Sequence, residues 1–559
     1  MIRSRRSLVA LMAILAIALA ACGSSSGSKG GGSSDTGAVP DGGTLVLGAE
    51  QEPDCADWIA SCAGAAWGVY TMEAHTVPRV FDFVKKDGVW TNVPNILVTK
   101  MPEASTVGGK QVVTYDLNPK AVWSDGEPIT ATDFKYTWDQ IVTGTDIYDT
   151  SGYDKIEAID DSKPTQVVVT FKEPYASWRG LFNGGLYGVL PSHLLEGKDR
   201  TTELADGYSW SGGPWIAKWA KGSNVTLTPN PKWYGDKPHL DKVIFKFLAD
   251  TAAEFQAFKS GEVSAIYPQP QPEVIAAVKS ASSSANTYFT AETGNSEALW
   301  MNNASAPLDS VEVRQAVAYA IDRDAMIKSL FGALGVNKAS QSLNAPILSK
   351  YSDGSVFSKY TPQPGKVKSL LEGAGYTKGS DGFYAKGGTR LSLTMRTTAG
   401  NKRRELTEQI LQEQLKKAGI ELKIDNQSAG DLFGTSLPNG DYQMALYAQT
   451  LTSLEPGLCS IMCSANIPSD ANGNVGQNWT RSKVDGLDAP LETVDSSIVE
   501  SERISASKKG DQLMGEAVVS LPFDPMPNIM LWSKKIVGPV GDNPLLSMFG
   551  NIDQWGVKK

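Results

Sequence analysis

Side chains that commonly carry acid–base chemistry are sparse and poorly spaced in this chain. Its three histidines, His75, His193 and His239, lie far apart and match neither a metalloprotease helix nor a proton-shuttle pair. The adjacent carboxylates of Asp160 and Asp161 precede Ser-Lys-Pro, which is typical of a solvated turn. The sequence contains no phosphate-binding loop and no dinucleotide fingerprint. We therefore expect no catalytic residues, no cofactor and no bound metal, and we expect that the protein is not an enzyme.

A Gly-x-Ser-x-Gly string at 23–27 matches the nucleophile motif of many hydrolases. That motif requires a strand before it and a helix after it, whereas 23–43 consists mostly of Gly and Ser. A stretch of this composition behaves as a flexible coil that reaches roughly 25 Å. We interpret 23–43 as a linker.

The N-terminus has the parts of an export signal. An arginine-rich start precedes an unbroken apolar run of about 14 residues, from Leu8 to Ala21, which is shorter than the roughly 20 needed to span a bilayer. The run ends in Leu-Ala-Ala-Cys, and this string resembles a bacterial lipobox. The resemblance implies that 1–22 is a signal peptide with an acylated Cys22. The mature protein would then be exported and lipid-anchored to the outer face of the cytoplasmic membrane.

Four further cysteines remain in the mature chain, namely Cys55, Cys62, Cys459 and Cys463. An even number of cysteines in an exported protein favours disulfides. Four cysteines allow three connectivities, and the short spacings favour the local pairs Cys55–Cys62 and Cys459–Cys463. A four-cysteine zinc site is the alternative, although the two cysteine pairs do not both have the spacing of a zinc knuckle.

Length and charge limit the class of protein. The chain has 559 residues, which is too many for one small hydrophobic core, so two or more lobes are expected. The formal net charge of −9 is spread along the chain and forms no long run of one sign. Because nucleic acid binding needs a clustered basic surface, we expect no nucleic acid partner.

Apolar periodicity predicts alternating strands and helices, and the clearest unit spans 390–427. There, alternating apolar residues precede a helical stripe and a second alternating stretch, which predicts a strand–helix–strand crossover with parallel strands. A helix over 130–142 is predicted to begin at Thr130 or Thr132. Thr251 and Glu254 have capping-box spacing at the start of another helix. Further strands are expected at 44–47, 110–118, 165–171, 223–229 and 241–248, a helical stripe at 313–321, and a left-handed helix end at Gly261.

Five strings, in order along the chain, resemble the family 5 extracellular solute-binding proteins of the peptide and nickel type. One of them joins a Ser-Asp-Gly turn to a helix start, where Asp125 and Gly126 supply the bend. The strings are AVWSDGEPITATDF (121–134), GPWI through NPKWYGDKPHLD (213–241), DSVEVRQAVAYAIDR (309–323), LLEGAGY (370–376) and DYQMAL (441–446).

The resemblance implies an α/β, bilobal periplasmic-binding-protein-like fold of type II (cluster C), with an extra subdomain inserted in the first lobe. It also implies a monomer that binds a small solute in the cleft between the lobes and delivers it to the permease subunits of an ABC importer. The chain would cross between the lobes near 292 and 528. The implied ranges are 44–80, 207–292 and 528–559 for the first lobe, 81–206 for the inserted subdomain and 293–527 for the second lobe.

Three segments map to the cleft in this family, and they supply the candidate binding residues. For each aromatic candidate, packing in the core is the alternative, and Trp123 and Trp138 are assigned to the core. The candidates are Glu50, Trp58 and Trp67 after the first strand, Trp300 and Asn302 at the crossing, and Tyr447, Gln449, Thr452, Asn478 and Trp479 in the second lobe.

An oligopeptide is the solute that the resemblance favours. Peptide binders of this family often hold the ligand's ammonium on an aspartate, and Thr452 stands at the corresponding place here. Because an unpaired buried ammonium costs several kcal/mol, either Glu50 or Glu455 takes that role or the ligand has no free N-terminus. An oligosaccharide ligand and a ligand-sensing receptor remain the alternatives, while the scarcity of histidine disfavours nickel complexes.

Overall fold

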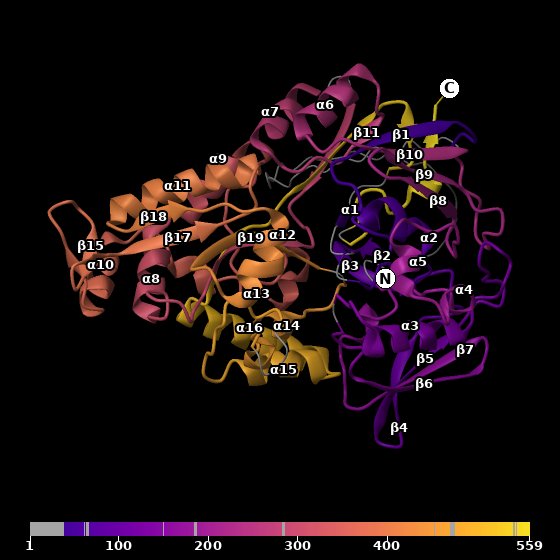
Figure 1. Cartoon of the computed structure of the whole chain (residues 1–559), viewed down its shortest axis with the longest axis horizontal. Coiled ribbons are helices and arrows are strands. Elements are labelled where there is room, and N and C mark those ends of the chain that lie inside the picture. Colours follow the sequence, from indigo (N-terminus) through magenta and orange to yellow (C-terminus); the bar gives the residue numbers. More distant parts are fainter. Residues whose placement is uncertain are drawn as a thin grey trace, which may run out of the picture.

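The protein has two lobes that stand side by side (Figure 1). Segments from the first half of the chain form most of one lobe, and residues between about 295 and 524 form the other. Cys22 and Thr452 lie outside the described residues. The computed structural model describes residues 39–60, 62, 66–148, 150–183, 187–281, 285–451, 453–469, 476–539, 543 and 545–558.

A seven-stranded sheet organises the first lobe. Strand β1 pairs in parallel with β10 and β11, and the other neighbours are antiparallel. Three distant parts of the sequence therefore form one sheet. Its order is β12 (Ala285–Thr290), β21 (Asn528–Ser533), β11 (Ala265–Ile266), β1 (Thr44–Ala49), β10 (Lys242–Phe247), β9 (Asn224–Pro229) and β8 (Trp215–Ala220).

A four-stranded antiparallel sheet lies in the same lobe, with helix α3 (Ala131–Thr143) packed on it. The ring of Tyr115 in the sheet stacks on Phe134 of α3, with centroids 6.0 Å apart. Its strands all fall within the predicted subdomain 81–206, whose exact limits stay a prediction. The order is β4 (Glu103–Val107), β5 (Lys110–Asp116), β7 (Gln166–Phe171) and β6 (Ile156–Lys163), and the hairpin β2 (Phe81–Lys86) and β3 (Val89–Pro94) precedes it.

A five-stranded sheet organises the second lobe. Strands β17 and β18 are parallel, with helix α11 (Lys402–Ala418) between them in sequence, so the predicted crossover at 390–427 is confirmed. The bilobal α/β fold is thereby confirmed as well. The order is β18 (Glu421–Ile424), β17 (Ser392–Arg396), β19 (Met444–Thr450), β13 (Asn295–Met301) and β20 (Ser520–Asp524).

Helices cover both sheets and join the lobes on one side. The two faces of strand β21 pack on different cores. Met530 and Trp532 belong to the core of the first lobe. Ile529 and Leu531 pack with α6, α7 and the second lobe. The remaining long helices are α6 (Thr251–Ser260), α7 (Pro272–Ala281), α8 (Val311–Ala320), α9 (Arg323–Phe331), α10 (Pro364–Gly373), α15 (Asp488–Ser496) and α16 (Glu500–Ala517).

The chain passes between the two large sheets twice. It leaves β12 at Thr290 and enters β13 at Asn295, and it returns between Asp524 and Asn528. A buried ion-pair cluster stands at these passages, because Arg403 of α11 contacts both Glu297 and Asp524. The use of the two chain passages as hinges stays a prediction.

Several local predictions are confirmed and two are corrected. Helix α3 has the capping box of Thr130 with Asp133, and Gly261 ends α6 at a φ of 79°. The predicted capping box at Thr251 is wrong, because Asp250 caps α6 and accepts from the amide of Ala253. The turn at Asp160 and Asp161 is also wrong, since both lie within β6. Trp123 is fully buried, and Trp138 packs partly buried against the same core.

Both favoured cysteine pairs are disulfides in the structure. Cys55–Cys62 and Cys459–Cys463 have Cα–Cα distances of 5.8 and 4.7 Å, so the zinc alternative is excluded for these four residues. Within the described ranges, no helix has both the length and the hydropathy of a bilayer-spanning segment.

Candidate ligand-binding cleft

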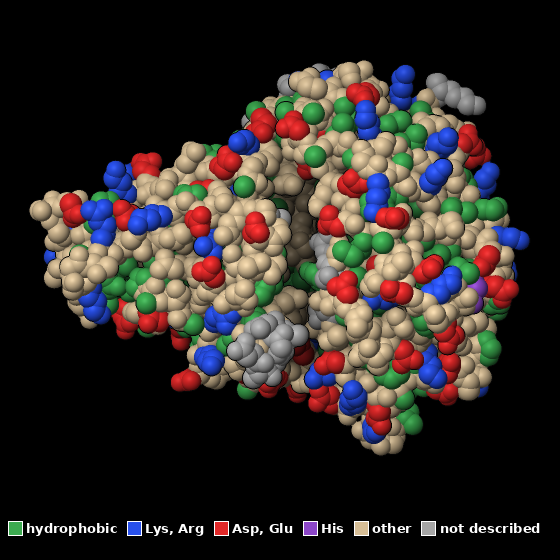
Figure 2. Space-filling model, in the orientation of Figure 1, with side chains coloured by type: hydrophobic (Ala, Val, Ile, Leu, Met, Phe, Trp, Pro, Cys, Tyr) green, Lys and Arg blue, Asp and Glu red, His purple; other side chains and the backbone are tan. Residues whose placement is uncertain are grey.

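A cavity of about 800 Å³ lies where the two lobes face each other. The space-filling view shows a deep groove running between them (Figure 2). One wall comes from residues between 148 and 187 in the first lobe, and the other comes from residues between 294 and 496 in the second. The cavity is therefore shared between the lobes and belongs to neither alone.

Tyrosines dominate the first-lobe wall, which includes Tyr148, Tyr153, Tyr175 and Tyr187. Side chains behind the wall hold its irregular backbone in place. Gln111 of β5 bonds the backbone of Tyr175 in both directions, donating to its carbonyl at 2.9 Å and accepting from its amide at 2.8 Å. The hydroxyl of Tyr153 accepts from the amide of Phe182 at 2.8 Å, and burial raises its pKa well above the usual value.

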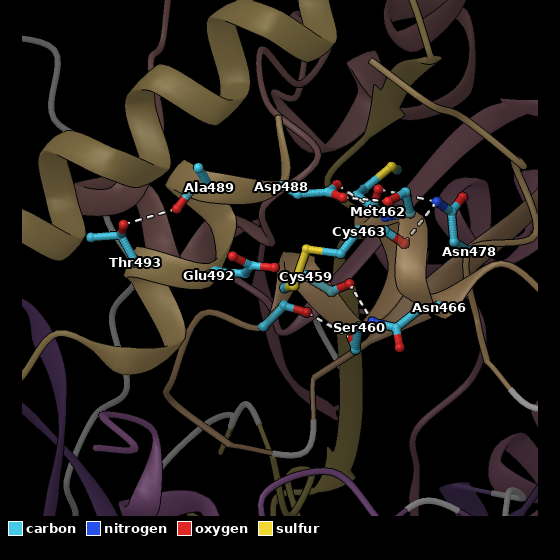
Figure 3. The surroundings of a disulfide bond; sticks show 12 residues. Cys459, Ser460, Met462, Cys463, Asn466, Asn478, Asp488, Ala489, Glu492 and Thr493 are labelled. Carbon is cyan, nitrogen blue, oxygen red and sulfur yellow. Dashed lines mark hydrogen bonds between the residues drawn. A yellow bond between two sulfur atoms is a disulfide. The ribbon is translucent and has the colours of Figure 1, made fainter. Parts of the chain in front are cut away.

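The second-lobe wall is built around the short helix α14 (Leu458–Met462) and the Cys459–Cys463 disulfide, both of which line the cavity. Asn478 donates from Nδ2 to the carbonyls of Met462 and Cys463 at 3.0 and 3.1 Å, which satisfies the end of the helix. Asn466 donates to the carbonyl of Cys459 at 2.8 Å. Figure 3 shows these amides donating to backbone carbonyls beside the disulfide. A small covalent loop and two amide side chains thus keep this wall in one shape.

The lobes touch directly at one edge of the cavity. The amide of Ala176 donates to the carbonyl of Asp495 at 2.7 Å, which joins the first lobe to helix α15. Beside it, Arg503 of α16 donates to the hydroxyl of Ser177 at 3.1 Å and to the carboxylate of Glu455 at 2.9 Å. Burial raises the pKa of Glu455, while the guanidinium of Arg503 lowers it. The bonds of Ala176 with Asp495 and of Ser177 with Arg503 thus link the two lobes at this edge.

Gln449 is the predicted binding residue that lines this cavity. It lies near the end of β19, half-buried. Thr452 is outside the described residues, but its neighbours Leu451 and Ser453 both line the cavity. The binding role of Gln449 and Thr452 stays a prediction.

The other predicted residues of the second lobe lie behind the wall. The rings of Trp300 and Tyr447 stack 5.1 Å apart, and the indole of Trp300 donates to the carbonyl of Tyr447 at 2.8 Å. Asn302 is buried and donates to the carbonyls of Gly440 and Tyr442. Asn478 supports α14, and Trp479 packs against Tyr447 at 5.9 Å. None of these five side chains lines the 800 Å³ cavity, and their direct contact with a solute stays a prediction.

The predicted residues of the first lobe also lie away from this cavity. Trp58 is buried and donates to the hydroxyl of Tyr208 at 2.9 Å, and Trp67 packs among Tyr70, Tyr267 and Phe549.

Glu50 is buried and accepts from Thr251 and from the amide of Gln269. Burial raises the pKa of Glu50 to about 7. Trp58 and Trp67, in contrast, have the environment of core packing residues, which is the alternative given for each aromatic candidate.

Sequence reasoning missed the four wall tyrosines and the carboxylates of α15. The tyrosines lie in irregular stretches with no period, so no pattern distinguishes them from surface residues. For the second-lobe wall, the pair Cys459 and Cys463 was the available signal in the sequence. A short disulfide loop indicates an ordered segment within an otherwise irregular stretch of chain.

A bilobal α/β protein with a cavity enclosed by both lobes has the architecture of a solute-binding protein. A family model described as bacterial extracellular solute-binding proteins, family 5, matches residues 97–462. This chain belongs to that family.

Curated relatives match most of the chain. The oligopeptide-binding protein OppA of Mycobacterium tuberculosis is 27% identical over 521 residues, covering 88% of this chain and 81% of OppA. The oligopeptide-binding protein AppA of Bacillus subtilis is 26% identical over 481 residues, covering 83% of this chain and 84% of AppA.

Solved structures show the same fold. The periplasmic EDTA-binding protein EppA superposes with a TM-score of 0.81 at 23% identity, covering 94% of this chain and 98% of EppA. Bacillus subtilis AppA in complex with a nonapeptide superposes with a TM-score of 0.76 at 19% identity, covering 93% of this chain and all of AppA.

Proposed function

We propose that this chain is the substrate-binding component of an ABC importer and that it captures a peptide in the cavity between its lobes. The observation that carries the proposal is the shared wall, in which segments of both lobes line a cavity of about 800 Å³. This volume lies within the roughly 300–1,000 Å³ of typical small-molecule sites. Because both lobes contribute to the wall, separation of the lobes would open the cavity and their approach would close it around a solute.

Two observations support a peptide as the solute. Curated relatives that match more than four fifths of this chain are named oligopeptide-binding proteins. The fold also superposes on a protein that holds a nonapeptide. In this proposal Gln449 and Thr452 contact the solute, while Trp300, Tyr447, Asn478 and Trp479 shape the wall from behind.

The remaining parts of the proposal follow the family and the N-terminal sequence. The chain is exported, anchored through acylated Cys22, monomeric, and delivers its solute to permease subunits without changing it chemically. Residues 81–206 form an inserted subdomain of the first lobe, and the passages near 292 and 528 act as hinges. The folded body begins before 44, because the amide of Gly42 donates to the carbonyl of His239.

An oligosaccharide is the second candidate solute. Four tyrosines line one wall of the cavity, and sugars stack on aromatic faces. This candidate keeps the transport role and changes only the cargo.

Native mass spectrometry of gently purified protein, followed by denaturing extraction, tests the proposal. Co-purified peptides are the expected result, and bound glycans would replace the peptide with the second candidate. Di- to pentapeptides are then ranked against short glycans by thermal shift. A peptide at about 100 times its dissociation constant adds roughly 2.7 kcal/mol to the unfolding free energy. Turnover of an added peptide would contradict a binding role.

A further inference from the structure

Helix α16 carries a buried polar stripe behind the second-lobe wall. Arg503, Ser507 and Asp511 follow one another at intervals of four residues, so they lie on one face of the helix, and all three are buried. Buried polar side chains need hydrogen-bond partners. Arg503 binds Glu455 of the wall. The partners of Ser507 and Asp511 lie in the segment 342–344, which also lines the cavity.

Asn344 is the residue of this segment that joins the stripe to the cavity. Its side chain lines the cavity, whereas neither Ser342 nor Ser507 does. The Nδ2 atom of Asn344 donates to the hydroxyls of Ser342 and Ser507, both at 3.3 Å. The main-chain amide of Asn344 donates to the same hydroxyl of Ser342 at 3.0 Å. Both hydrogens of Nδ2 are therefore bound to hydroxyls behind the wall.

The number of available hydrogens determines which way the amide of Asn344 faces. A hydroxyl has one hydrogen, and Ser342 donates its hydrogen to the carboxylate of Asp511 at 2.9 Å. The same carboxylate accepts from the amide of Asp353 at 2.8 Å. Ser342 can therefore only accept from Asn344, so the nitrogen of the side-chain amide faces Ser342 and the oxygen faces away from it.

The Oδ1 atom of Asn344 has no partner within the described part of the chain. The residue is only 6% exposed, and no described group donates to this oxygen. An amide oxygen has two lone pairs that accept hydrogen bonds, and an acceptor that is buried without a donor is costly. Water can meet this oxygen in the unliganded protein. A solute that fills the cavity displaces such water and must supply the donor itself.

We propose that Oδ1 of Asn344 accepts a hydrogen bond from a main-chain amide of the bound peptide, and that Asp511, acting through Ser342, is the positioning residue that turns this oxygen toward the solute. The inference rests on the proposed function. Such a bond requires an N–H group at one point along the peptide main chain and does not depend on the identity of the peptide's side chains.

Calorimetric titration with penta-alanine and its four single-ester analogues tests this contact. Each analogue replaces one amide N–H by an oxygen atom and keeps the length of the peptide. The titrations are made at pH 8, because burial raises the pKa of Asp511 to about 7 and its carboxyl must be ionised. We expect the parent protein to bind at least one analogue about 5- to 30-fold more weakly than penta-alanine, because that analogue leaves Oδ1 unpaired.

The variant Asn344→Ala assigns this loss to Asn344. It should bind penta-alanine about 5- to 30-fold more weakly than the parent does. It should also bind one weakened analogue within about twofold of penta-alanine, because the two probes then differ in no contact with Asn344. Asn337→Ala, at an exposed position outside the cavity, is the matched control and should change no affinity.

The variant Asp511→Asn tests the positioning role. Its new amide oxygen accepts from Asp353, so its nitrogen donates to Ser342, and the hydrogen of Ser342 becomes available to Oδ1 of Asn344. The ester penalty that depends on Asn344 should therefore shrink. Thermal unfolding shows whether each variant is folded. A crystal structure of the parent with penta-alanine, expected to place an amide nitrogen within hydrogen-bond distance of Oδ1, tests the contact without any substitution.

The failures of the two proposals are distinguishable. Equal binding of all the analogues by the parent, or ester penalties that Asn344→Ala leaves unchanged, would overturn the contact and leave peptide capture intact. A penalty that Asn344→Ala removes and Asp511→Asn leaves at full size would overturn the positioning role of Asp511. Failure of every peptide probe to bind, together with binding of glycans, would instead overturn the proposed function.

Discussion

The guanidinium of Arg503 in the second lobe donates a hydrogen bond to the hydroxyl of Ser177 in the first lobe, at 3.1 Å, although 326 residues separate them. The same guanidinium holds Glu455 in the cavity wall and donates to the carbonyl of Val494 at the end of α15. One side chain therefore orders the second-lobe wall and contacts the opposite lobe. Its two roles can be separated by substitution.

Replacing Arg503 by Met should lower the unfolding free energy by about 3 kcal/mol at pH 7, because it leaves Glu455 buried without its partner. Urea denaturation measures the loss. The double variant Arg503→Met with Glu455→Gln should recover most of it, since no buried charge remains. A loss below about 1 kcal/mol in the single variant would show that the ion pair is not needed.

Replacing Ser177 by Ala removes the side-chain hydrogen bond between the lobes, while the bond of Ala176 to Asp495 and the pair of Arg503 with Glu455 remain. Stability should fall by only about 1 kcal/mol. The unliganded protein should become more open, which small-angle X-ray scattering detects as a larger radius of gyration, and the liganded radius should not change. Ser505→Ala, on the exposed side of α16, is the control. An unchanged unliganded radius in Ser177→Ala would mean that this contact does not hold the lobes together.

Removing the Cys459–Cys463 disulfide by a double Ser substitution should cost about 2 kcal/mol, as expected for closing so short a loop. Solute affinity should fall as well, because both cysteines line the cavity. The matched control is the double Ser variant of Cys55 and Cys62, a loop of similar size away from the cavity. It should lose similar stability and keep its affinity. Equal affinity losses in both variants would contradict a specific role for the second-lobe loop.

Glu50 should make stability depend on pH. Its pKa is raised from 4.5 to about 7, mainly by burial, so the folded protein favours the protonated form. The destabilising contribution of Glu50 is absent below about pH 4.5, grows between pH 4.5 and 7, and is complete above pH 7. Glu50→Gln should therefore gain stability relative to the parent across that window, by up to about 3 kcal/mol.

Urea denaturation of parent and Glu50→Gln at pH 4, 5.5 and 7.5 measures this difference. Glu103→Gln, at an exposed position on β4, should show none at any pH. A constant difference between Glu50→Gln and the parent across the three pH values would show that folding does not shift the pKa of Glu50.

Much of the fold was accessible from the sequence, because its signals are local. The helix at Thr130 carries its own cap, and the unit at 390–427 alternates, repeats and alternates again within 38 residues. The start of α6 was misplaced by one residue because Asp250 and Thr251 are both good caps, and Thr251 turned out to bond Glu50 instead.

The site was far less predictable than the fold. Trp300 and Asn302 resemble binding residues by type, yet tertiary packing buries both behind the wall. Ala176 and Asp495 lie more than 300 residues apart along the chain and come into contact only where the two lobes meet. No local sequence pattern predicts this contact, because it depends on how the two complete lobes pack against each other.

A crystal structure of the protein with its co-purified solute tests the central claim most directly. The account predicts a peptide held between the lobes, in contact with Tyr175 from one side and Gln449 from the other. A solute bound wholly within one lobe, or an interlobe cavity that stays empty while the protein carries its ligand elsewhere, would contradict it.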